Sequence, residues 1–304
     1  PAFESGITLE ALENSELTYE KKHELNIGVA FGFVDNRINV EFDWYRRNNF
    51  DLIGFTQTMG VGGVTTKLAN DATMQSTGCE FTISTTNIKT KDFKWTTDWI
   101  FGWAENTITK LDSRSQVYEL VNGFGRTEGR PIGALYSIPF AGLTEEGLPT
   151  FYIDAEHTQI AGPDNYDAIY FQEYENVDYL KYEGSIDPTI TGSFGNTFSW
   201  KGLKLNVFFT YSFGNVLRLD DLCPVYSSDY SDLTASMKEM KNRWMVPGDE
   251  QLTTIPSIPT VRQMREINAL NNAYSAYNYS TERVAKGDFI RLKELSLAYD
   301  LPKK

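Results

Sequence analysis

Apolar and polar residues alternate along several stretches of the chain, and a period of two is typical of β-strands with two different faces. In residues 24–33, large apolar side chains from Leu25 to Phe33 occupy every second position, and polar or small residues stand between them. A tight turn at Asp35-Asn36 follows, and the alternation resumes in residues 38–45. These two runs are therefore predicted to form a hairpin with one apolar and one polar face.

Five further runs show the same pattern. They cover residues 79–84, 95–104, 190–198, 203–213 and 290–299. In the last run the pair Lys293-Glu294 breaks the alternation, which predicts a β-bulge. The sequence thus predicts seven strands of roughly 10–12 residues, longer than the ~5–6 residues usual in soluble sheets.

The connections between these strands alternate in length. Short turns lie near residues 35, 90 and 201, and the long polar segments are 48–78, 105–187 and 215–286. Outer-membrane barrels have short periplasmic turns and long outer loops, whereas a soluble sandwich has turns every ~8–12 residues without this asymmetry. We therefore predict an all-β, antiparallel transmembrane barrel with long extracellular loops, whose apolar rows face lipid and whose polar rows face the lumen. A soluble sandwich with an aromatic core is the alternative.

Aromatic residues and charge agree with this prediction. Trp44, Tyr45 and Trp103 fall near the outer strand ends, and Trp95 and Trp200 fall near the inner ends, as expected for belts at the two membrane interfaces. The mean hydropathy is −0.38 and no stretch reaches the ~18 apolar residues of a membrane helix, which spanning strands do not require. With a net charge of −13 and no basic stripe, a nucleic-acid partner is not expected.

Residues that carry chemistry are sparse. Cys79 and Cys223 form no CxxC pair, although a disulfide stays open, and His23 and His157 are isolated. No GxSxG motif occurs to support a barrel protease or phospholipase. The acidic residues are interpreted as solvated loops, with calcium or lipopolysaccharide binding as the alternative. We therefore expect no enzyme, no cofactor and no metal site.

One helix is expected within the long segments. In residues 231–246, Leu233, Met237, Met240 and Trp244 recur at helical spacing. This spacing predicts one short amphipathic helix, whose buried face contains the two methionines.

Several segments, in order along nearly the whole chain, carry a family resemblance. They are residues 20–28 with 36–38 and 44–47, then 128–133 with 142–143 and 147–149, then 198–205, 243–250 and 287–302. Together they resemble the C-terminal part of SusC/RagA-type TonB-dependent outer-membrane transporters of Bacteroidetes. One departure is Gly78-Cys79-Glu80, where the family more often has a Gly-Val-Glu-like run.

This resemblance implies a 22-stranded barrel in the cell outer membrane, plugged by an N-terminal domain and driven by TonB. It also implies a SusD-like surface lipoprotein as a lid, and a glycan or peptide cargo. The chain begins at Pro1 and stops just after a strand, so we expect residues 1–304 to be the C-terminal part of the barrel, about its fourteenth to twentieth strands, without the plug domain. A secreted or surface β-rich glycan-binding module is the competing function.

Three sets of candidate site residues follow from these expectations. The hinge of the lid is expected in the loop with Gly60, Gly62 and Gly63. The lumen-facing row contains Glu24, Asn26, Glu41 and Asp43, which either line a cargo path or bind the plug. Aromatic residues in 151–182 are candidates for contact with cargo or lid, because aromatic rings stack on sugars and apolar surfaces. They are Phe151, Tyr152, Tyr166, Tyr170, Phe171, Tyr174, Tyr179 and Tyr182. The alternative is that this loop packs on itself and its aromatics form a small separate core.

Overall fold

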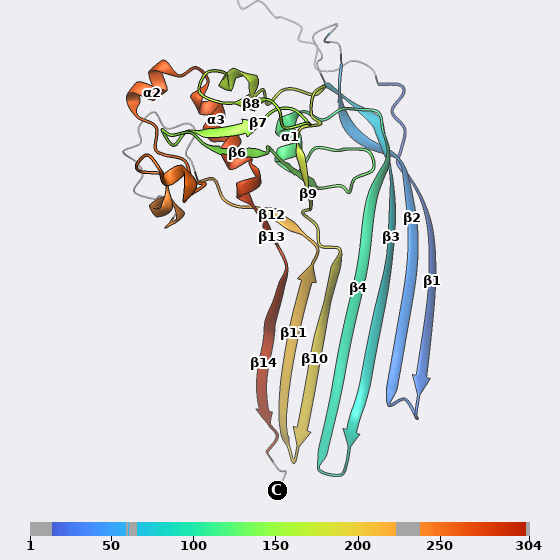
Figure 1. Cartoon of the computed structure of the whole chain (residues 1–304). Coiled ribbons are helices and arrows are strands. Elements are labelled where there is room, and N and C mark those ends of the chain that lie inside the picture. Colours follow the sequence, from blue (N-terminus) through green and yellow to red (C-terminus); the bar gives the residue numbers. More distant parts are fainter. Residues whose placement is uncertain (1–13, 59, 61–65, 223–237, 302–304) are drawn as a thin grey trace, which may run out of the picture.

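The computed structural model describes residues 14–58, 60, 66–222 and 238–301, and a single seven-stranded antiparallel sheet dominates it (Figure 1). The strand order across this sheet is β1-β2-β3-β4-β10-β11-β14. The strands are β1 (Lys21–Phe33), β2 (Ile38–Gln57), β3 (Thr66–Lys89), β4 (Phe93–Leu111), β10 (Ile190–Trp200), β11 (Leu203–Phe213) and β14 (Phe289–Tyr299). The seven predicted strands are confirmed, and they pair in the order of the chain.

Cross-strand register separates two faces over the whole width of the sheet. Directly paired residues point to the same face, and each row below follows the pairs from β1 to β14. One row is Val29, Phe42, Phe81, Phe101, Gly192, Tyr211 and Ile290. A row on the other face is Ala30, Glu41, Thr82, Ile100, Ser193, Thr210 and Arg291. The predicted apolar and polar faces therefore exist across all seven strands, although one row places Thr85, Thr97 and Asn196 on the apolar face.

The apolar face is not covered. Phe31, Leu295 and Leu297 are 53%, 65% and 68% exposed. Among the described residues, the other sheets have two or three short strands, and they lie beside the upper end of the large sheet (Figure 1). The main cluster of buried apolar residues likewise contains no member of the apolar rows. The sandwich alternative, which requires these rows to be buried between two sheets, is excluded.

Residues with positive φ form hairpin turns at one end of the sheet, the lower end in Figure 1. Val34, Asp35 and Asn36 all adopt positive φ between β1 and β2, and Lys201-Gly202 do so between β10 and β11. Such left-handed pairs suit two-residue hairpins, because their twist matches that of the strands. The predicted bulge is also confirmed, because the register shifts where Glu294 pairs with Phe208 and Leu292 pairs with Phe209.

The strands near the other end are longer than predicted. The segment 48–78 was expected to be a loop, but β2 continues to Gln57 and β3 already begins at Thr66. Likewise β4 continues to Leu111. In these extensions both faces contain polar residues, so the alternation that marks the lower strands is missing although the backbone pairing persists.

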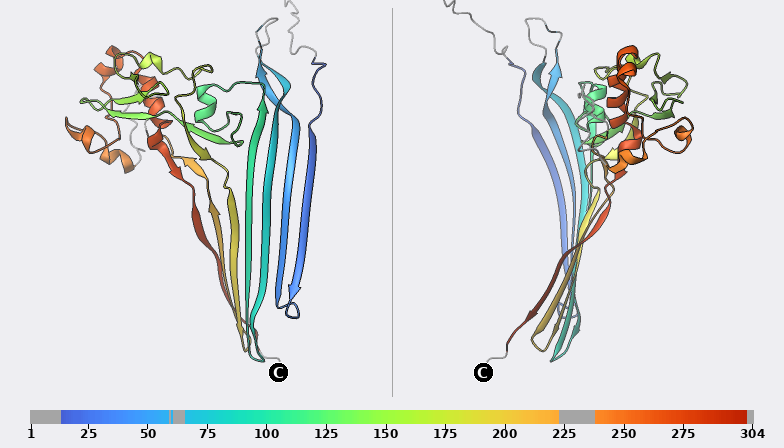
Figure 2. Two further views of the ribbon diagram at one scale, coloured as in Figure 1. Left: turned by 45° about the vertical axis from the view of Figure 1, so that its right-hand side comes forward. Right: turned by 90° about the vertical axis from the view of Figure 1, so that its left-hand side faces the viewer.

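The two longest connections fold together beside the upper end of the sheet, as both views in Figure 2 show. Their elements are α1 (Val117–Val121), β5 (Ala134–Ser137), β6 (Phe140–Leu143), β7 (Pro149–Tyr152), β8 (Ile160–Ala161), η2 (Tyr166–Ala168), β9 (Lys181–Ser185), β12 (Val216–Arg218), η4 (Lys238–Asn242), η5 (Asp249–Gln251), α2 (Val261–Glu266), α3 (Leu270–Asn278), η6 (Thr281–Arg283) and β13 (Val284–Lys286). We call this assembly the loop region. It contains the buried apolar cluster of the molecule, with Ile138, Phe151 and Tyr277 at most 1% exposed.

The helix predicted over residues 231–246 is only partly testable. Residues 238–242 form the short 3-10 helix η4, in which Met240 is buried, and Trp244 lies beyond its end. Met237, like Cys223, lies outside the described residues. No helix in the described part of the chain is long and apolar enough to cross a membrane.

Candidate functional site

The four residues predicted to face the lumen lie together on the polar face of the sheet. Glu24 accepts a hydrogen bond from Arg47 Nε at 2.8 Å and forms an ion pair with Lys22 Nζ at 2.6 Å. Glu41 is paired with Ala30, and Asp43 with Gly28. A side chain at Gly28 would collide with the Asp43 carboxylate, so the glycine provides the space that this acid occupies. Small residues of β1 thus accommodate the acids of β2.

Three of the aromatic candidates are buried within the loop region. Phe151, Tyr166 and Tyr179 are 0%, 1% and 7% exposed and belong to its apolar core. Tyr166 Oη donates to the carbonyl oxygen of Pro149 at 2.7 Å, and burial raises the pKa of Tyr179 to about 12. These three side chains stabilise the loop region, as the alternative of a separate core states, and do not reach a ligand in this arrangement.

The other aromatic candidates divide into two groups. Tyr152 stacks on His157 at 4.6 Å, and Tyr182 lies between Tyr136 and the guanidinium of Arg130, which is 4.2 Å from its ring centroid. Phe171 packs against the buried core. Tyr170 and Tyr174, in contrast, are 56% and 46% exposed.

Tyr174 lines a cavity near one end of the large sheet. This cavity has a volume of about 410 Å³ and lies where the ends of β2 and β3 meet the segments that follow β4 and α1. We call it the rim pocket. Its wall includes Phe55, Asp71, Arg114, Phe124, Arg126 and Tyr174.

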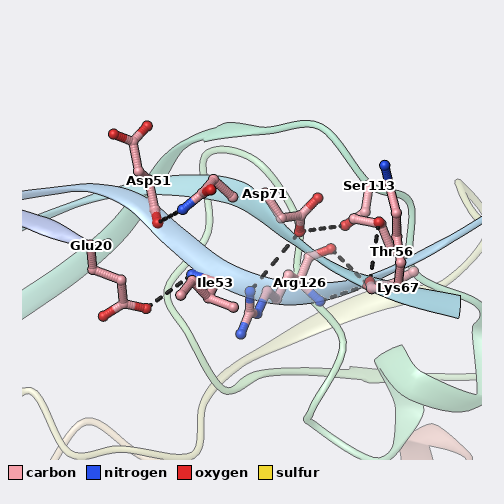
Figure 3. Close-up of polar contacts among 10 residues, drawn as sticks. Glu20, Asp51, Ile53, Thr56, Lys67, Asp71, Ser113 and Arg126 are labelled. Atoms are coloured by element: carbon pink, nitrogen blue, oxygen red, sulfur yellow. Dashed lines mark hydrogen bonds and ion pairs between the residues drawn. The ribbon is translucent and has the colours of Figure 1, made fainter. Parts of the chain in front are cut away.

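At one wall of the rim pocket, Asp71 lies between Ser113 and Arg126 (Figure 3). Ser113 Oγ donates to Asp71 Oδ2 at 2.7 Å, and Arg126 Nη1 is 4.0 Å from the same oxygen. Asp71 is only 2% exposed, and its other oxygen, Oδ1, has no hydrogen-bond partner among the described residues. Gly54 allows this approach, because a Cβ atom there would lie 2.9 Å from Arg126 Nη1.

Backbone contacts fix the pocket from the loop side. The Ser115 hydroxyl accepts from Arg126 N at 2.8 Å and donates to Arg126 O at 3.1 Å. The Glu173 carboxylate accepts from the backbone N–H groups of Tyr174, Glu175 and Asn176, which lowers its pKa. Both the guanidinium and the tyrosine ring are therefore attached to constrained backbone.

Tyr174 is one of the candidates predicted from the sequence, and the charged residues around it are not. Asp71, Arg114 and Arg126 belong to no motif. They come together because β3 pairs with β4, Asp112 N donates to Asp71 O at 2.9 Å just beyond that pairing, and Ser115 holds the backbone of Arg126. Of the hinge glycines, Gly60 has a positive φ of 70°, and Gly62 and Gly63 lie outside the described residues.

Comparison with known proteins gives consistent relatives. No family model matches the chain. TonB-dependent receptor P3 of Formosa agariphila is 26% identical over 98% of this chain, and TonB-dependent receptor SusC of Bacteroides thetaiotaomicron is 34% identical over 32% of it. The chain spans 29% of the length of the first of these relatives, and the matched part of the chain covers 10% of the second.

Solved structures agree in fold. The RagAB peptide transporter superposes with a TM-score of 0.69 at 24% identity, covering 98% of this chain and 31% of that one. The RagAB peptide importer in its closed-closed state also has a TM-score of 0.69, at 25% identity, with 97% of this chain and 30% of that one covered. The resemblance to SusC/RagA-type TonB-dependent transporters is thus confirmed over nearly the whole chain, and these relatives are receptors and transporters rather than enzymes.

Proposed function

We propose that this chain forms part of the wall and the outer loops of an outer-membrane importer for nutrients too large to diffuse, with a glycan or a peptide as cargo. The observation that carries the proposal is the uncovered and mainly apolar face, which extends across seven strands. Monomeric soluble proteins rarely expose an apolar patch of more than a few hundred Å². Hydrocarbon is the environment in which such a face is stable.

The height of the apolar face suits a membrane. Strands β11 and β14 each contain 11 residues. At about 3.4 Å per residue their ten intervals span about 34 Å, and a tilt of about 40° reduces the height to about 26 Å. This value agrees with the apolar band of ~25 Å in outer-membrane barrels.

Both edges of the sheet require further strands. Within the described chain β1 pairs only with β2, and β14 pairs only with β11. Unpaired backbone groups in hydrocarbon cost several kcal/mol each, so an open edge is unstable there. We infer that strands outside this chain close the sheet into a barrel of about 22 strands, with the polar face and its acids, such as Glu41 and Asp43, toward the lumen.

The relatives support the partners in this proposal. Transport would be driven by TonB, a SusD-like surface lipoprotein would cover the outer loops, and a plug domain would fill the lumen. A glycan-binding module secreted or held at the cell surface is the second candidate. The exposed apolar rows disfavour it, and solubility without detergent would identify it at once.

A matched pair of variants in the full-length protein tests the proposal. Phe209 lies on the apolar face between Phe194 and Leu292, whereas Thr210 lies on the polar face opposite Ser193. An arginine facing lipid near the bilayer centre costs about 2–4 kcal/mol. Phe209→Arg is therefore expected to reduce assembly into the outer membrane, measured as heat-modifiable folded protein in the membrane fraction, and Thr210→Arg to assemble normally. Equal assembly of both variants would show that the faces are assigned incorrectly.

A further inference from the structure

A pocket of about 320 Å³ lies at the lower end of the sheet in Figure 1, between the turn that joins β3 to β4 and the turn that joins β10 to β11. The backbones of the two turns are in direct contact, because Lys201 N donates to Asp92 O at 3.0 Å. The end of β14 is attached to them through Asp300 N, which donates to Gly202 O at 2.8 Å. Three segments that are far apart in the sequence thus hold the walls of this pocket, which we call the turn pocket.

The turn pocket is basic, although the net charge of the chain is −13. Four lysines and two aspartates line it, which gives a net charge of +2. They are Lys91, Lys94, Lys201 and Lys204, with Asp92 and Asp300. Among the residues that the structure describes, none of these four ammonium groups forms an ion pair, whereas four other lysines do so elsewhere. The positive charge that is left uncompensated here favours an anionic ligand.

One side of the turn pocket continues the apolar face of the sheet. Phe93, Trp200 and Leu203 are directly paired across β4, β10 and β11, and Leu203 also pairs with Tyr299 of β14. Trp200 and Tyr299 are 55% and 57% exposed. Tryptophan and tyrosine at the end of a spanning strand are typical of the membrane interface, where the ring is buried and the polar tip stays in water. An acyl chain that lies along the apolar face would therefore reach the pocket from this side.

The lysines lie on the opposite face and in the turns themselves. Lys94 and Lys204 both pair with Ser199, which places them on the polar face. Lys91 and Lys201 belong to the two turns, just beyond the ends of the paired strands. Lys201 Nζ is 5.7 Å from the ring centroid of Trp200, so an ammonium group lies close to the apolar side. An apolar wall beside ammonium donors is the arrangement that a phospholipid requires at the level of its headgroup.

From this arrangement we infer that the turn pocket binds the headgroup of an anionic glycerophospholipid in the leaflet nearest to the turns. Lys91 and Lys201 contact the phosphate, and the Trp200 ring packs against the glycerol and the first acyl carbons. Lys94 and Lys204 add positive potential from the polar face. A soluble phosphate would leave the apolar wall unused, and a protein segment in the lumen would meet only the polar face. The inference rests on the proposed function, because it requires the apolar face to lie in a membrane.

The test measures lipid binding to the purified full-length protein by native mass spectrometry, which resolves single lipids bound to a folded membrane protein. Three probes separate headgroup charge from acyl chains: dioleoylphosphatidylglycerol, the zwitterionic dioleoylphosphatidylethanolamine, and glycerophosphoglycerol, which is the anionic headgroup without acyl chains. The double variant Lys91→Gln/Lys201→Gln is compared with the control Lys67→Gln/Lys286→Gln, which removes the same charge near the upper end of the sheet. Heat-modifiability of each sample is recorded, so that a loss of assembly is not mistaken for a loss of binding.

Phosphatidylglycerol is expected to bind more tightly than phosphatidylethanolamine, and glycerophosphoglycerol is not expected to displace it at equal concentration. The double variant should weaken phosphatidylglycerol binding roughly thirtyfold, since each lysine contributes about 1 kcal/mol at an anionic lipid surface and about 1.4 kcal/mol is a factor of ten. The zwitterionic lipid should change by less than about twofold in the double variant, and both lipids by less than about twofold in the control.

Three results would overturn the inference. Equal affinity for the two lipids, or unchanged phosphatidylglycerol binding in the double variant, would show that the lysines do not select an anionic headgroup and would favour the plug domain as their partner. Displacement of the lipid by glycerophosphoglycerol at equal concentration would identify a site for soluble anions instead. None of these results affects the assembly test at Phe209 and Thr210, so failure of the inference is distinguishable from failure of the proposed function.

Discussion

Arg218 is predicted to hold the loop region together. Its guanidinium donates to three backbone carbonyl oxygens, those of Val121 at 2.9 Å, Tyr136 at 2.6 Å and Ser280 at 3.1 Å. These acceptors belong to α1, to β5 and to the segment before η6, so one side chain connects both long insertions of the sheet. Its cation also lies 5.7 Å from the ring centroid of Tyr279.

The destabilisation expected on removing Arg218 follows from the three carbonyl groups that would lose their hydrogen-bond donor. Val121, Tyr136 and Ser280 are all buried, and a buried acceptor without a donor costs about 1–3 kcal/mol. Burial also lowers the pKa of Arg218 to about 10, which shows that holding the charge there has its own cost. Removing the buried charge also removes the cost of its desolvation, which offsets part of this destabilisation. For Arg218→Met we therefore expect a net destabilisation of the loop region of about 3 kcal/mol.

Hydrogen exchange of the full-length protein measures this quantity locally. Peptides that cover α1 and β5 should open about a hundredfold more often in Arg218→Met, since about 1.4 kcal/mol corresponds to a factor of ten. Arg218→Lys should be intermediate, because a single ammonium group cannot replace the guanidinium fork. Arg262→Met is the control, since its exposed pair with Glu266 contributes little. If exchange in α1 and β5 is unchanged in Arg218→Met, the side chain does not stabilise the loop region as argued.

Three further predictions concern the sheet and the turn at Tyr174. Gly192→Ala should lower the unfolding temperature, because its methyl group would overlap the Ile100 carbonyl oxygen and the Tyr211 hydroxyl, whereas Gly102→Ala, whose nearest neighbours are 3.6 Å away, should leave it unchanged. Deletion of Lys293 should be tolerated in membrane assembly, because it removes only the bulge and restores regular alternation, while deletion of Ser296 should block assembly by turning Leu297 and Tyr299 to the polar face. Glu173 has a pKa below its ordinary value of 4.5, so its contribution to the Tyr174 turn is present above that value and is lost as pH falls through the lowered pKa. In Glu173→Gln, hydrogen exchange of residues 171–176, corrected for its intrinsic pH dependence, should be fast at neutral pH and should not change further on acidification.

The lower part of the sheet was predictable because a single physical requirement acts on it. When one face must be apolar and the other polar, the period-two pattern is set by the environment of the strand, residue by residue. Even the β-bulge at Lys293 could be predicted, because an extra residue must interrupt the alternation between Leu292 and Leu295. No long-range information was needed to reach these conclusions.

The upper part was not predictable in the same way. Between Asn48 and Gln57 the backbone stays paired with β3, but no single environment sorts its side chains, and the segment resembles a polar loop. The buried core of the loop region was not predictable for a different reason. Phe140 and Tyr277 lie 5.8 Å apart between ring centroids although they are distant in sequence, so neither shows locally that it is buried. Aromatic richness in 151–182 indicated rings in contact with something, but not whether that was a ligand or the loop itself.

The two parts of the chain obtain their stability from different sources, and this makes the proposals separable. The sheet has no apolar core of its own within the described residues, so its rows must be stabilised by lipid and by neighbouring strands. The loop region has a buried core that includes Phe151 and Tyr277 and is connected through Arg218. A substitution at Phe209 should therefore change assembly into the membrane without changing the loop core, and one at Arg218 should loosen the loops of a protein that still assembles.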